Sequence, residues 1–351
     1  MIPRSIDLLE KKIMSTKRVL LTGASGFVGS HVLRHLLVKT DWEIVCPVTF
    51  SHKGLQDRIR LSLAGDQAFE KRTKIVKCDL SFPISSITAR EFGKIDYVLN
   101  LASQSHVDRS IEEPANFIVN NVALICNLLD WARIASPEKI VHISTDEVYG
   151  PAPAGSAHRE WIDQYFPSNP YSASKAAQES IAFSYWRTFG LPIMITNTMN
   201  LIGEMQDPEK FIPMIMRRII SGEKIDIHGS LEGEIGSRFY LHARNQADAL
   251  LFLLNQDFPI YGVSDKPAKF HIVGEKEINN LDLANFIADY MKKKLNYQIV
   301  DFHTSRPGHD LRYALDGSKI AELGWQPPVS LFDSLRKTID WNMAHPEWLH
   351  I

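Results

Sequence analysis

A glycine-rich turn near the start of the chain constrains the fold more than any other feature of the sequence. The apolar run Val19-Leu20-Leu21 is followed by Gly23, Gly26 and Gly29 and then by an amphipathic helical pattern. In this context the first glycine permits a tight turn, the second lets the backbone approach a pyrophosphate, and the third lets the helix pack closely on the strand. Amide groups at the start of such a helix face the phosphates. The turn therefore predicts a dinucleotide-binding βαβ unit.

Short β-rich runs continue to alternate with longer helical patterns up to about residue 200. The later runs cover residues 44–46, 75–76, 97–99, 140–143 and 193–195. Strands separated by helix-length stretches imply right-handed crossovers and a doubly wound, Rossmann-like parallel sheet of the α/β class. Such a sheet binds its ligands at the carboxyl ends of the strands.

After about residue 200 the rhythm changes to a polar loop, a helical pattern over 212–220 and a glycine-rich stretch. We expect residues 201–351 to form mainly a smaller, mixed α/β lobe that closes over the sheet edge. Residues 243–265, which begin with a helical pattern over 243–254, are expected to return to the main lobe, which takes residues 17–200. Residues 1–16 are expected to form an N-terminal extension with a short amphipathic helix.

The composition excludes several classes of partner. The net charge of -2, from 39 basic and 41 acidic residues, gives no global field to attract nucleic acid or an anionic membrane. No run approaches the ~18 to 20 apolar residues that span a bilayer. The three cysteines, Cys46, Cys78 and Cys126, lie far apart in apolar stretches and predict reduced thiols without a disulfide or a metal cluster. We therefore expect a cytoplasmic protein that holds no metal.

Further residues of the predicted dinucleotide site follow the strands in sequence. Asp79 ends a strand, where its carboxylate can accept a hydrogen bond from an adenine amino group, and small residues after the next strand leave room for the cofactor. The full predicted set in the glycine turn and at these strand ends is Thr22, Gly23, Ser25, Gly26, Phe27, Val28, Gly29, Asp79, Leu80, Leu101, Ala102 and Ser103.

The loop after the second strand departs from the pattern of NAD-selective folds, which place an acid there to bind the ribose hydroxyls. This chain has no carboxylate at 46–53. It offers Thr49, Ser51, His52 and Lys53, and further on Arg58, which can receive a 2′-phosphate. The sequence therefore leans to NADP, with NAD as the alternative.

Two neighbouring motifs carry the predicted chemistry. The strand 140–143 runs into Ser144-Thr145-Asp146-Glu147, and Tyr171 and Lys175 follow, one helical turn apart on the same face. The lysine ammonium can lower the tyrosine pKa, so that a phenolate accepts a proton from a substrate hydroxyl while hydride leaves for the nicotinamide. The spacing thus indicates an enzyme that oxidises an alcohol, and Tyr171 and Lys175 also contact the cofactor.

With these motifs the chain resembles the extended short-chain dehydrogenase/reductase superfamily and, within it, the nucleoside-diphosphate-sugar 4,6-dehydratases, especially those of the dTDP-glucose type. The resemblance covers nearly all of the chain after residue 16. Its most specific parts are Ser144-Thr145-Asp146-Glu147-Val148-Tyr149-Gly150, Ser105-His106-Val107-Asp108-Arg109-Ser110, Pro208-Glu209-Lys210-Phe211-Ile212-Pro213 and Arg306-Pro307-Gly308-His309-Asp310.

The resemblance implies an NDP-hexose 4,6-dehydratase, because the adjacent acids are what dehydratases add to the tyrosine and lysine. Thr145 is then expected to hold the C4 oxygen. Glu147 as a carboxylate is expected to remove the C5 proton, and protonated Asp146 to donate to the departing C6 hydroxyl. Hydride returns to C6, and the cofactor is regenerated in each cycle.

The same resemblance assigns the substrate-binding side. Asn200 and Arg238 are expected to hold the diphosphate, and Arg306 and His309 to lie near the nucleotide. The full predicted substrate set is Ser105, His106, Asn200, Glu209, Lys210, His228, Arg238, Arg306 and His309. Three positions depart from the family pattern: Phe239 replaces an acid after Arg238, His228 replaces a tyrosine against the base, and Glu204 replaces a proline after Gly203.

Two other functions remain open at this point. A sugar-nucleotide 4-epimerase stops after the redox exchange at C4, and Asp146-Glu147 argues against it. A catalytically silent, dinucleotide-binding sensor typically loses the tyrosine or the lysine, and both are present. The nucleotide base and the hexose stereochemistry stay undefined.

The helical segments 115–133 and 172–189 carry apolar residues on more than the one face needed to cover a sheet. In the superfamily that the chain resembles, the equivalent helices form a four-helix bundle between two subunits. We therefore expect a homodimer.

Overall fold

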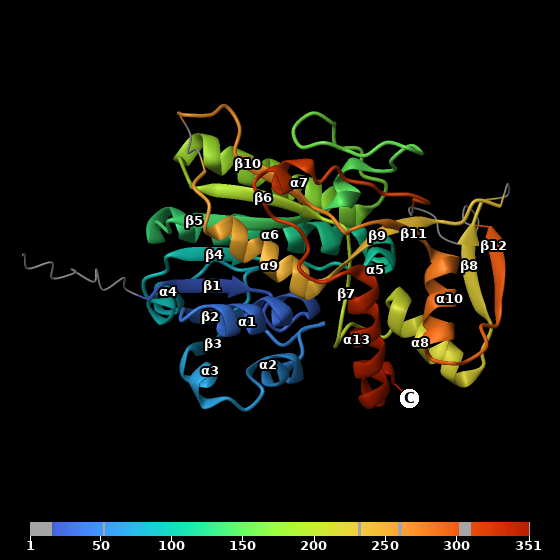
Figure 1. Ribbon diagram of the computed structural model, residues 1–351. Coiled ribbons are helices and arrows are strands. Elements are labelled where there is room, and N and C mark those ends of the chain that lie inside the picture. Colours follow the sequence, from blue (N-terminus) through green and yellow to red (C-terminus); the bar gives the residue numbers. More distant parts are fainter. Residues whose placement is uncertain (1–15, 52, 231–232, 259–261, 302–309, 351) are drawn as a thin grey trace, which may run out of the picture.

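Seven parallel strands form the central sheet of the computed structural model (Figure 1), in the order β10-β6-β5-β4-β1-β2-β3. The structure describes residues 16–51, 53–230, 233–258, 262–301 and 310–350. The strands of this sheet are β1 (Arg18–Thr22), β2 (Glu43–Val48), β3 (Thr73–Lys77), β4 (Tyr97–Asn100), β5 (Lys139–Thr145), β6 (Ile193–Thr198) and β10 (Ala268–Ile272). Every strand run predicted from the sequence lies in it, which confirms the doubly wound α/β class.

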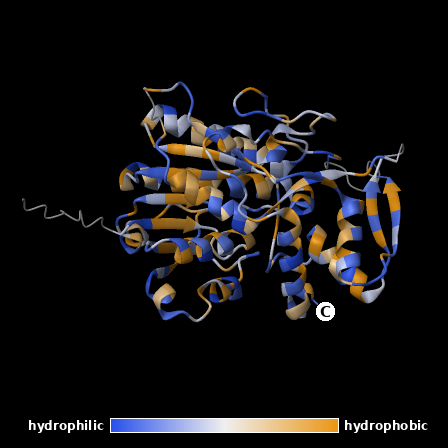
Figure 2. Ribbon diagram, viewed as in Figure 1, coloured by the Kyte–Doolittle hydropathy of each residue, from blue (hydrophilic) through white to orange (hydrophobic). Residues whose placement is uncertain are grey.

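Helices cover both faces of the sheet, so its central strands β1 and β4 are mostly apolar and buried, whereas the edge strand β3 is largely exposed (Figure 2). In β1, Val19 and Leu21 enter one core cluster while Leu20 enters the other. The first face is covered by α1 (Phe27–Lys39), α2 (Gln56–Leu63), α3 (Gln67–Lys71), α9 (Ala243–Leu254) and α12 (Ser318–Glu322). The second is covered by α4 (Ser86–Phe92), α6 (Pro114–Ala135) and α7 (Pro170–Phe189), with α5 (Val107–Glu112) beside the last two.

A smaller, mixed α/β lobe packs beside the strand ends and has a core cluster of its own. Its sheets have the orders β11-β9-β7 and β12-β8. The elements are β7 (Asn200–Ile202), α8 (Phe211–Ser221), β8 (Ile225–Gly229), β9 (Ser237–His242), β11 (Glu277–Asn279), α10 (Asn280–Tyr290), β12 (Tyr297–Asp301), α13 (Leu331–Ala344) and the 3-10 turn η2 (Pro346–Leu349). The helix predicted over 212–220 is α8.

The chain passes between the two lobes more than once. After β9, α9 packs against α1, and β10 pairs with β6 at the edge of the main sheet. On this packing we propose that residues 243–272 belong with 17–200 in the main lobe and that most other residues after 200 form the smaller one. The predicted N-terminal extension lies outside the described residues, apart from Thr16.

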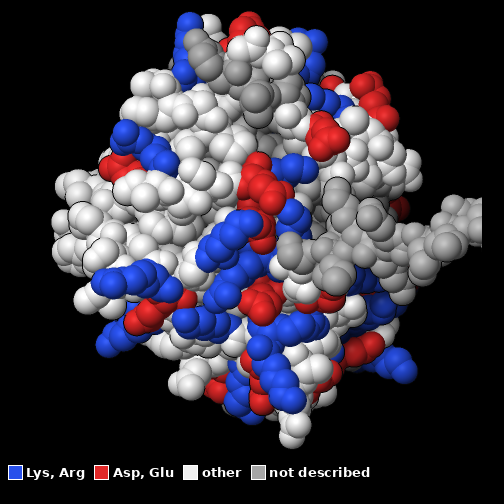
Figure 3. Space-filling model, turned by 90° about the vertical axis from the view of Figure 1, so that its left-hand side faces the viewer, with Lys and Arg blue, Asp and Glu red and all other residues white. Residues whose placement is uncertain are grey.

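The charged side chains on the surface show no strong excess of either sign. Figure 3 shows one side of the molecule, on which basic and acidic side chains are interspersed. Of the helices that the structure describes, α6 alone is long and apolar enough to cross a membrane, by length and composition only, a test that core helices of soluble proteins also pass. Here α6 packs against α7 and its Leu128 and Leu129 enter the core under the sheet.

The approach of α1 to the glycine turn yields a prediction about stability. A Cβ at Gly29 would lie 2.0 Å from the carbonyl oxygen of Gly23, so Gly29→Ala forces backbone atoms apart. Overpacking typically costs about 1–3 kcal/mol, and the better helix propensity of alanine, up to about 1 kcal/mol, offsets part of it. Chemical denaturation should show a loss of about 1–2 kcal/mol. Val38→Ala, at an exposed position of the same helix, is the control, and equal stability of the two variants would contradict the packing argument.

Candidate active site

The carboxyl end of β5 carries the first part of the candidate site. Thr145 is the last residue of β5 and caps the 3-10 turn η1 (Asp146–Tyr149). Its Oγ1 donates to Asp146 Oδ1 at 2.9 Å and accepts from the backbone N–H of Glu147 at 3.3 Å. The short turn therefore sets both acids beside the threonine hydroxyl.

The start of α7 fixes the second part. Asn169 is the N-cap, with a capping box to Ser172 and Pro170 in the first turn. Its Nδ2 also donates to Glu147 Oε2 at 3.2 Å. One buried side chain thus begins the helix that carries Tyr171 and orients the neighbouring acid. Asn169 was not predicted as a site residue, although Asn-Pro before a helical run is a recognisable start signal.

Tyr171 lies one residue beyond the helix start, with its ring edge-on to Phe117 at a centroid distance of 6.3 Å. Its backbone N–H donates to Ser110 Oγ at 3.1 Å. Burial and the nearby charge of Glu147 raise the pKa of Tyr171, while a hydrogen bond with Thr145 opposes that shift.

Lys175 is 4% exposed, and its ammonium donates to Ile143 O at 2.8 Å and to Gln178 Oε1 at 2.7 Å. Burial lowers its pKa to about 8, against the raising effect of Glu179. The sequence predicted that this lysine lowers the pKa of Tyr171, whereas burial, and after it the charge of Glu147, raises that pKa. An ammonium has three donors, so the third proton is left for a ligand.

Gln178 is a further site residue that was not predicted from the sequence. It is fully buried, and its Nε2 donates to the carbonyl oxygen of Asn121 at 2.6 Å, which links Lys175 to α6. Its position three residues after Lys175 on one helix face is the signal that would have identified it.

The two acids differ in their surroundings. Asp146 is 4% exposed, and burial, then the charge of Glu147, raises its pKa to about 7. Its Oδ2 has no hydrogen-bond partner among the described residues. Burial also raises the pKa of Glu147, but Asn169, Arg238 and Lys210 oppose that effect. An acid that stays protonated near neutral pH thus lies beside one that ionises more readily.

The glycine turn forms a cradle that fits a dinucleotide. Gly23 has φ of +72°, and a Cβ at Gly26 would lie 3.1 Å from Gly23 O, so side chains are excluded where phosphates would lie. Thr22 Oγ1 donates to Asn100 Oδ1 at 2.8 Å and accepts from the amides of Leu101 and Ala102 at 3.0 and 2.9 Å. These bonds join the strand ends that were predicted to share the site.

The other predicted cofactor residues lie at the same edge. Phe27 and Val28 begin α1, and Ser25 O accepts from the N–H of Leu55 at 2.9 Å. Asp79 accepts from Ser81 at 2.9 Å and 2.7 Å, so one of its oxygens is already engaged, and Ser103 Oγ donates to Gln104 O at 3.2 Å. Asn127 Nδ2 donates to the carbonyl oxygen of Leu80 at 2.9 Å.

The loop after β2 is engaged with the smaller lobe. Lys53 Nζ lies 2.6 Å from Glu209 Oε1, and buried Arg58 pairs with Asp207 at 3.2 Å. Thr49 and Ser51 share a hydrogen bond of 2.6 Å between their hydroxyl oxygens. His52 lies outside the described residues. The two cations predicted to receive a 2′-phosphate are therefore already paired with acids.

The predicted substrate residues are only partly brought together. Arg238 and Lys210 both act on the pKa of Glu147, and the Arg238 guanidinium lies over the Tyr313 ring at 4.7 Å. Arg238 also donates to the carbonyl oxygens of Ser237, at 2.7 Å, and of Asp310 and Leu311. His106 Nε2 lies 3.7 Å from Glu209 Oε1.

Of the remaining members, Ser105 lies in the main lobe, Asn200 and His228 lie in the smaller lobe, and the other two lie outside the described residues. Asn200 begins β7 and is exposed, Ser105 is exposed just before α5, and His228 lies in β8. Arg306 and His309 lie outside the described residues. Of the departures from the family pattern, Phe239 packs in the small cluster with Val148 and Tyr313.

Glu204, the third departure, forms a cluster with His31 and His242 whose ligand atoms lie within 4.8 Å of one another. His242 Nδ1 accepts from the N–H of Arg244 at 2.9 Å, so its Nε2 carries the proton toward Glu204 Oε2 at 3.0 Å. His31 Nε2 lies 2.9 Å from the Glu204 carbonyl oxygen and must donate to it. Because both nitrogens act as donors, the arrangement fits a hydrogen-bonded cluster and not a metal site.

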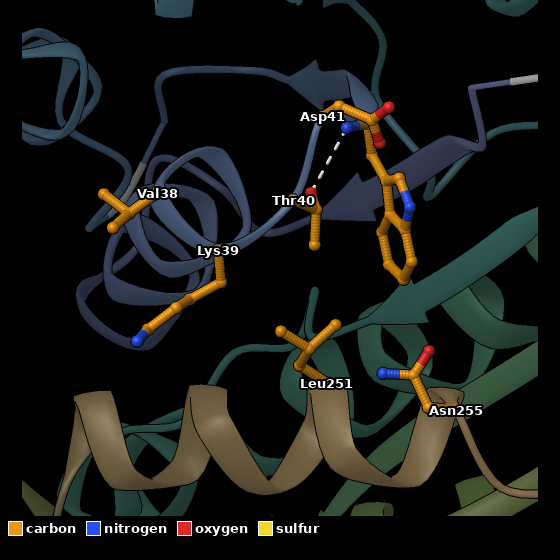
Figure 4. Close-up of a pocket in the computed structure, with 7 residues that line it drawn as sticks. Val38, Lys39, Thr40, Asp41, Leu251 and Asn255 are labelled. Carbon is orange, nitrogen blue, oxygen red and sulfur yellow. Dashed lines mark hydrogen bonds between the residues drawn. The ribbon is translucent and has the colours of Figure 1, made fainter.

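A separate surface groove lies at the opposite end of the strands (Figure 4). It is formed by the end of α1, the following residues Thr40 to Trp42, Leu251 of α9, and Asn255 directly after α9. None of the predicted site residues lines it, so it is not part of the candidate site.

Comparisons with known proteins agree with this geometry. The family model described as GDP-mannose 4,6 dehydratase matches residues 20–338. The chain is 33% identical to the dTDP-glucose 4,6-dehydratase of Shigella flexneri, over 95% of this chain and 94% of that protein. The crystal structure of the dTDP-glucose 4,6-dehydratase DesIV from Streptomyces venezuelae, with NAD bound, is similar with a TM-score of 0.81 and 32% identity, covering 94% of this chain and 98% of that one.

The fold is shared more widely. The UDP-glucose 4-epimerase of Thermus thermophilus, also solved with NAD, has a TM-score of 0.78 and 25% identity, covering 92% of this chain and 98% of the other. Fold similarity alone thus does not separate dehydratase from epimerase, whereas the family model and the sequence identity do. The chain belongs to the nucleoside-diphosphate-sugar 4,6-dehydratase family of the short-chain dehydrogenase/reductase superfamily.

Proposed function

We propose that this enzyme converts an NDP-hexose into the corresponding NDP-4-keto-6-deoxyhexose. The observation that carries the proposal is the pair of buried Asp146 and half-buried Glu147 that follows β5, close to Tyr171. An epimerase has no need of a second proton donor and a separate base at this position. A silent sensor has no need of Tyr171 and the buried Lys175.

Each proton transfer of the proposed reaction is assigned to one side chain. Tyr171 accepts the proton of the C4 hydroxyl while Thr145 holds the oxygen, and Lys175 directs its third N–H to the cofactor ribose. When bound, the nicotinamide takes up a hydride from C4 and later returns it to C6. Glu147 then removes the C5 proton that the ketone has made acidic. Asp146 gives its proton to the C6 hydroxyl, which leaves as water, and Glu147 returns a proton to C5.

For the substrate, we propose that Arg238 and Asn200 hold the diphosphate, because a planar guanidinium binds phosphate oxygens in pairs. His228 is assigned to the base side, and Glu209 and Lys210 to the sugar side. Screening dTDP-, UDP-, GDP- and CDP-hexoses for a 4-keto product identifies the base. The relatives named for dTDP-glucose make dTDP-hexoses the first to try.

For the cofactor, we propose NAD. The lean to NADP is not supported, since the similar dehydratase DesIV was solved with NAD and since Lys53 and Arg58 are already paired with acids. The cytoplasm is the proposed compartment, because the three cysteines are free and burial raises the pKa of each thiol.

The division of protons between Tyr171 and Glu147 predicts two different failures. Tyr171→Phe should abolish oxidation at C4, so no reduced nicotinamide forms when substrate is added. Glu147→Gln should still form it but lose about 10²–10⁴-fold in dehydration, the usual effect of a general base. Absorbance in a single turnover and product analysis separate the two, with Tyr185→Phe on the same helix as control. Full formation of deoxy product by Glu147→Gln would refute the assignment.

The raised pKa of Asp146 predicts how activity and stability change with pH in the wild type and in Asp146→Asn. Dehydration by the wild type should fall as pH rises through about 7, where Asp146 loses its proton, and the variant should lack this limb. Because the folded state binds the proton more tightly than the unfolded state, Asp146 destabilises the fold progressively as pH rises from its ordinary pKa of 3.8 to about 7, and the full loss applies above that pH. The variant should therefore melt higher than wild type at about pH 8, with a smaller difference at about pH 5. If Asp146→Asn melted below the wild type at about pH 8, the assignment of Asp146 as a buried acid with a raised pKa would be contradicted.

We also propose a homodimer through α6 and α7. Val119 and Ile134 of α6 are 67% and 88% exposed, and Phe189 at the end of α7 is 45% exposed. Two copies of this pair of helices would form a four-helix bundle that covers these side chains.

A charge placed on this face should dissociate the dimer. Val119→Glu is expected to run as a monomer at micromolar concentration in light scattering, where the wild type runs at twice the chain mass. Ile87→Glu, at a similarly exposed position of α4, is the matched control and should stay dimeric. A monomeric wild type would rule the proposal out.

A further inference from the structure

The loop after β2 lacks the acid that NAD-selective folds use, yet acids of the smaller lobe lie against it. β2 ends at Val48, and the residues that follow offer the hydroxyls of Thr49 and Ser51 and then Lys53. In a Rossmann sheet the ribose that distinguishes NAD from NADP lies at this strand end. The charged groups around Lys53 would therefore act on the 2′ position of the bound ribose.

Lys53 is held by the segment between β7 and α8. Its Nζ lies 2.6 Å from Glu209 Oε1 and 3.9 Å from Asp207 Oδ1. Partial burial opposes ionisation of Glu209, yet the hydrogen bond from Lys53 brings its pKa below the usual value, so it is charged at neutral pH.

Arg58, the second cation near the loop, has its donors committed. It is completely buried, its Nε and Nη2 donate to Met205 O at 3.1 and 2.8 Å, and Nη1 donates to Lys53 O at 2.6 Å. Nη2 also lies 3.2 Å from Asp207 Oδ2. Arg58 thus fixes the backbone of Lys53 and of the acidic segment and has no free edge for a phosphate.

Two cations thus face two carboxylates near the strand end, and the charge of Lys210 acts on the same Glu209 carboxylate. A 2′-phosphate, which carries about -1.5 to -2 at neutral pH, would have to take Lys53 from Glu209 and remain close to both acids. A ribose with two free hydroxyls adds no charge. Its hydroxyls can donate hydrogen bonds to the side-chain oxygens of Thr49 and Ser51.

We propose that Glu209 and Asp207 select NAD over NADP, in place of the missing acid after β2. Lys53 is the residue through which they act, because it is neutralised while Glu209 is present and becomes available to a phosphate when Glu209 is not. This inference rests on the proposed function for the presence of a dinucleotide. The residues that it concerns, Glu209 and Asp207, come from the smaller lobe, which is proposed to bind the NDP-hexose.

Competition between the two dinucleotides tests the proposal. The purified protein is equilibrated with an equimolar mixture of NAD and NADP, washed and denatured, and the released dinucleotides are quantified. Wild type should release predominantly NAD. Glu209→Gln should shift the bound ratio about tenfold toward NADP, which corresponds to ~1.4 kcal/mol. This variant is chosen over Asp207→Asn, because buried Arg58 would lose its anion in the latter.

Two further variants make the result specific. Glu209→Gln combined with Lys53→Met should return the ratio toward that of wild type, since no cation is released. Asp57→Asn removes an acid of α2 that pairs with Arg60, at 3.1 Å, and should leave the ratio unchanged. An unchanged ratio in Glu209→Gln with dinucleotide bound, or equal binding of NADP and NAD by wild type, would overturn this inference alone. Absence of any bound dinucleotide would overturn the proposed function as well.

Discussion

The active-site edge depends on one fully buried ion pair, Lys269 of β10 with Glu179 of α7, whose charged atoms lie 2.7 Å apart. Removing two charges from water is costly, so such a pair persists only when its remaining hydrogen-bonding groups are satisfied. Glu179 also accepts from Asn197 at 2.6 Å and from Tyr165 at 2.5 Å. The Lys269 ammonium lies over the rings of Tyr149, Tyr165 and Trp161 at 4.7 to 4.8 Å. Strands, helix and the turn after β5 are thereby fixed to one another.

This pair acts on the chemistry through position and charge. Glu179 lies one helical turn beyond Lys175 and raises its pKa against the effect of burial, which keeps an ammonium where the mechanism needs one. Tyr149 ends the turn that carries Asp146 and Glu147, and its hydroxyl is 2.9 Å from His271 Nε2. The ion pair therefore acts on Lys175 through the charge of Glu179. It acts on the turn that carries Asp146 and Glu147 through the packing of Lys269 on Tyr149.

The sequence predicted the sheet well because the information is local. Alternating apolar runs, glycine spacing and helical periodicity lie within a few residues of one another, and α9 begins and ends where its pattern indicates. The spacing of Tyr171 and Lys175 was readable in the same way, since both residues lie in α7, one turn apart. Asn169 and Gln178 carried signals that were local too, but their partners, Glu147 and Asn121, lie far away in sequence.

The lean to NADP is not supported, for a reason that the pattern of residues at one strand end does not contain. Lys53 looks available when its own loop is read alone, whereas its partner Glu209 arrives from a segment 156 positions later. That segment is itself held in place: Met205 adopts φ of +63°, and Arg58 donates twice to its carbonyl oxygen. Glu204 adds a second attachment through His242. Because residues 204–209 are anchored to both lobes, the charge around Lys53 and the position of the segment that carries Glu209 are set by the same contacts.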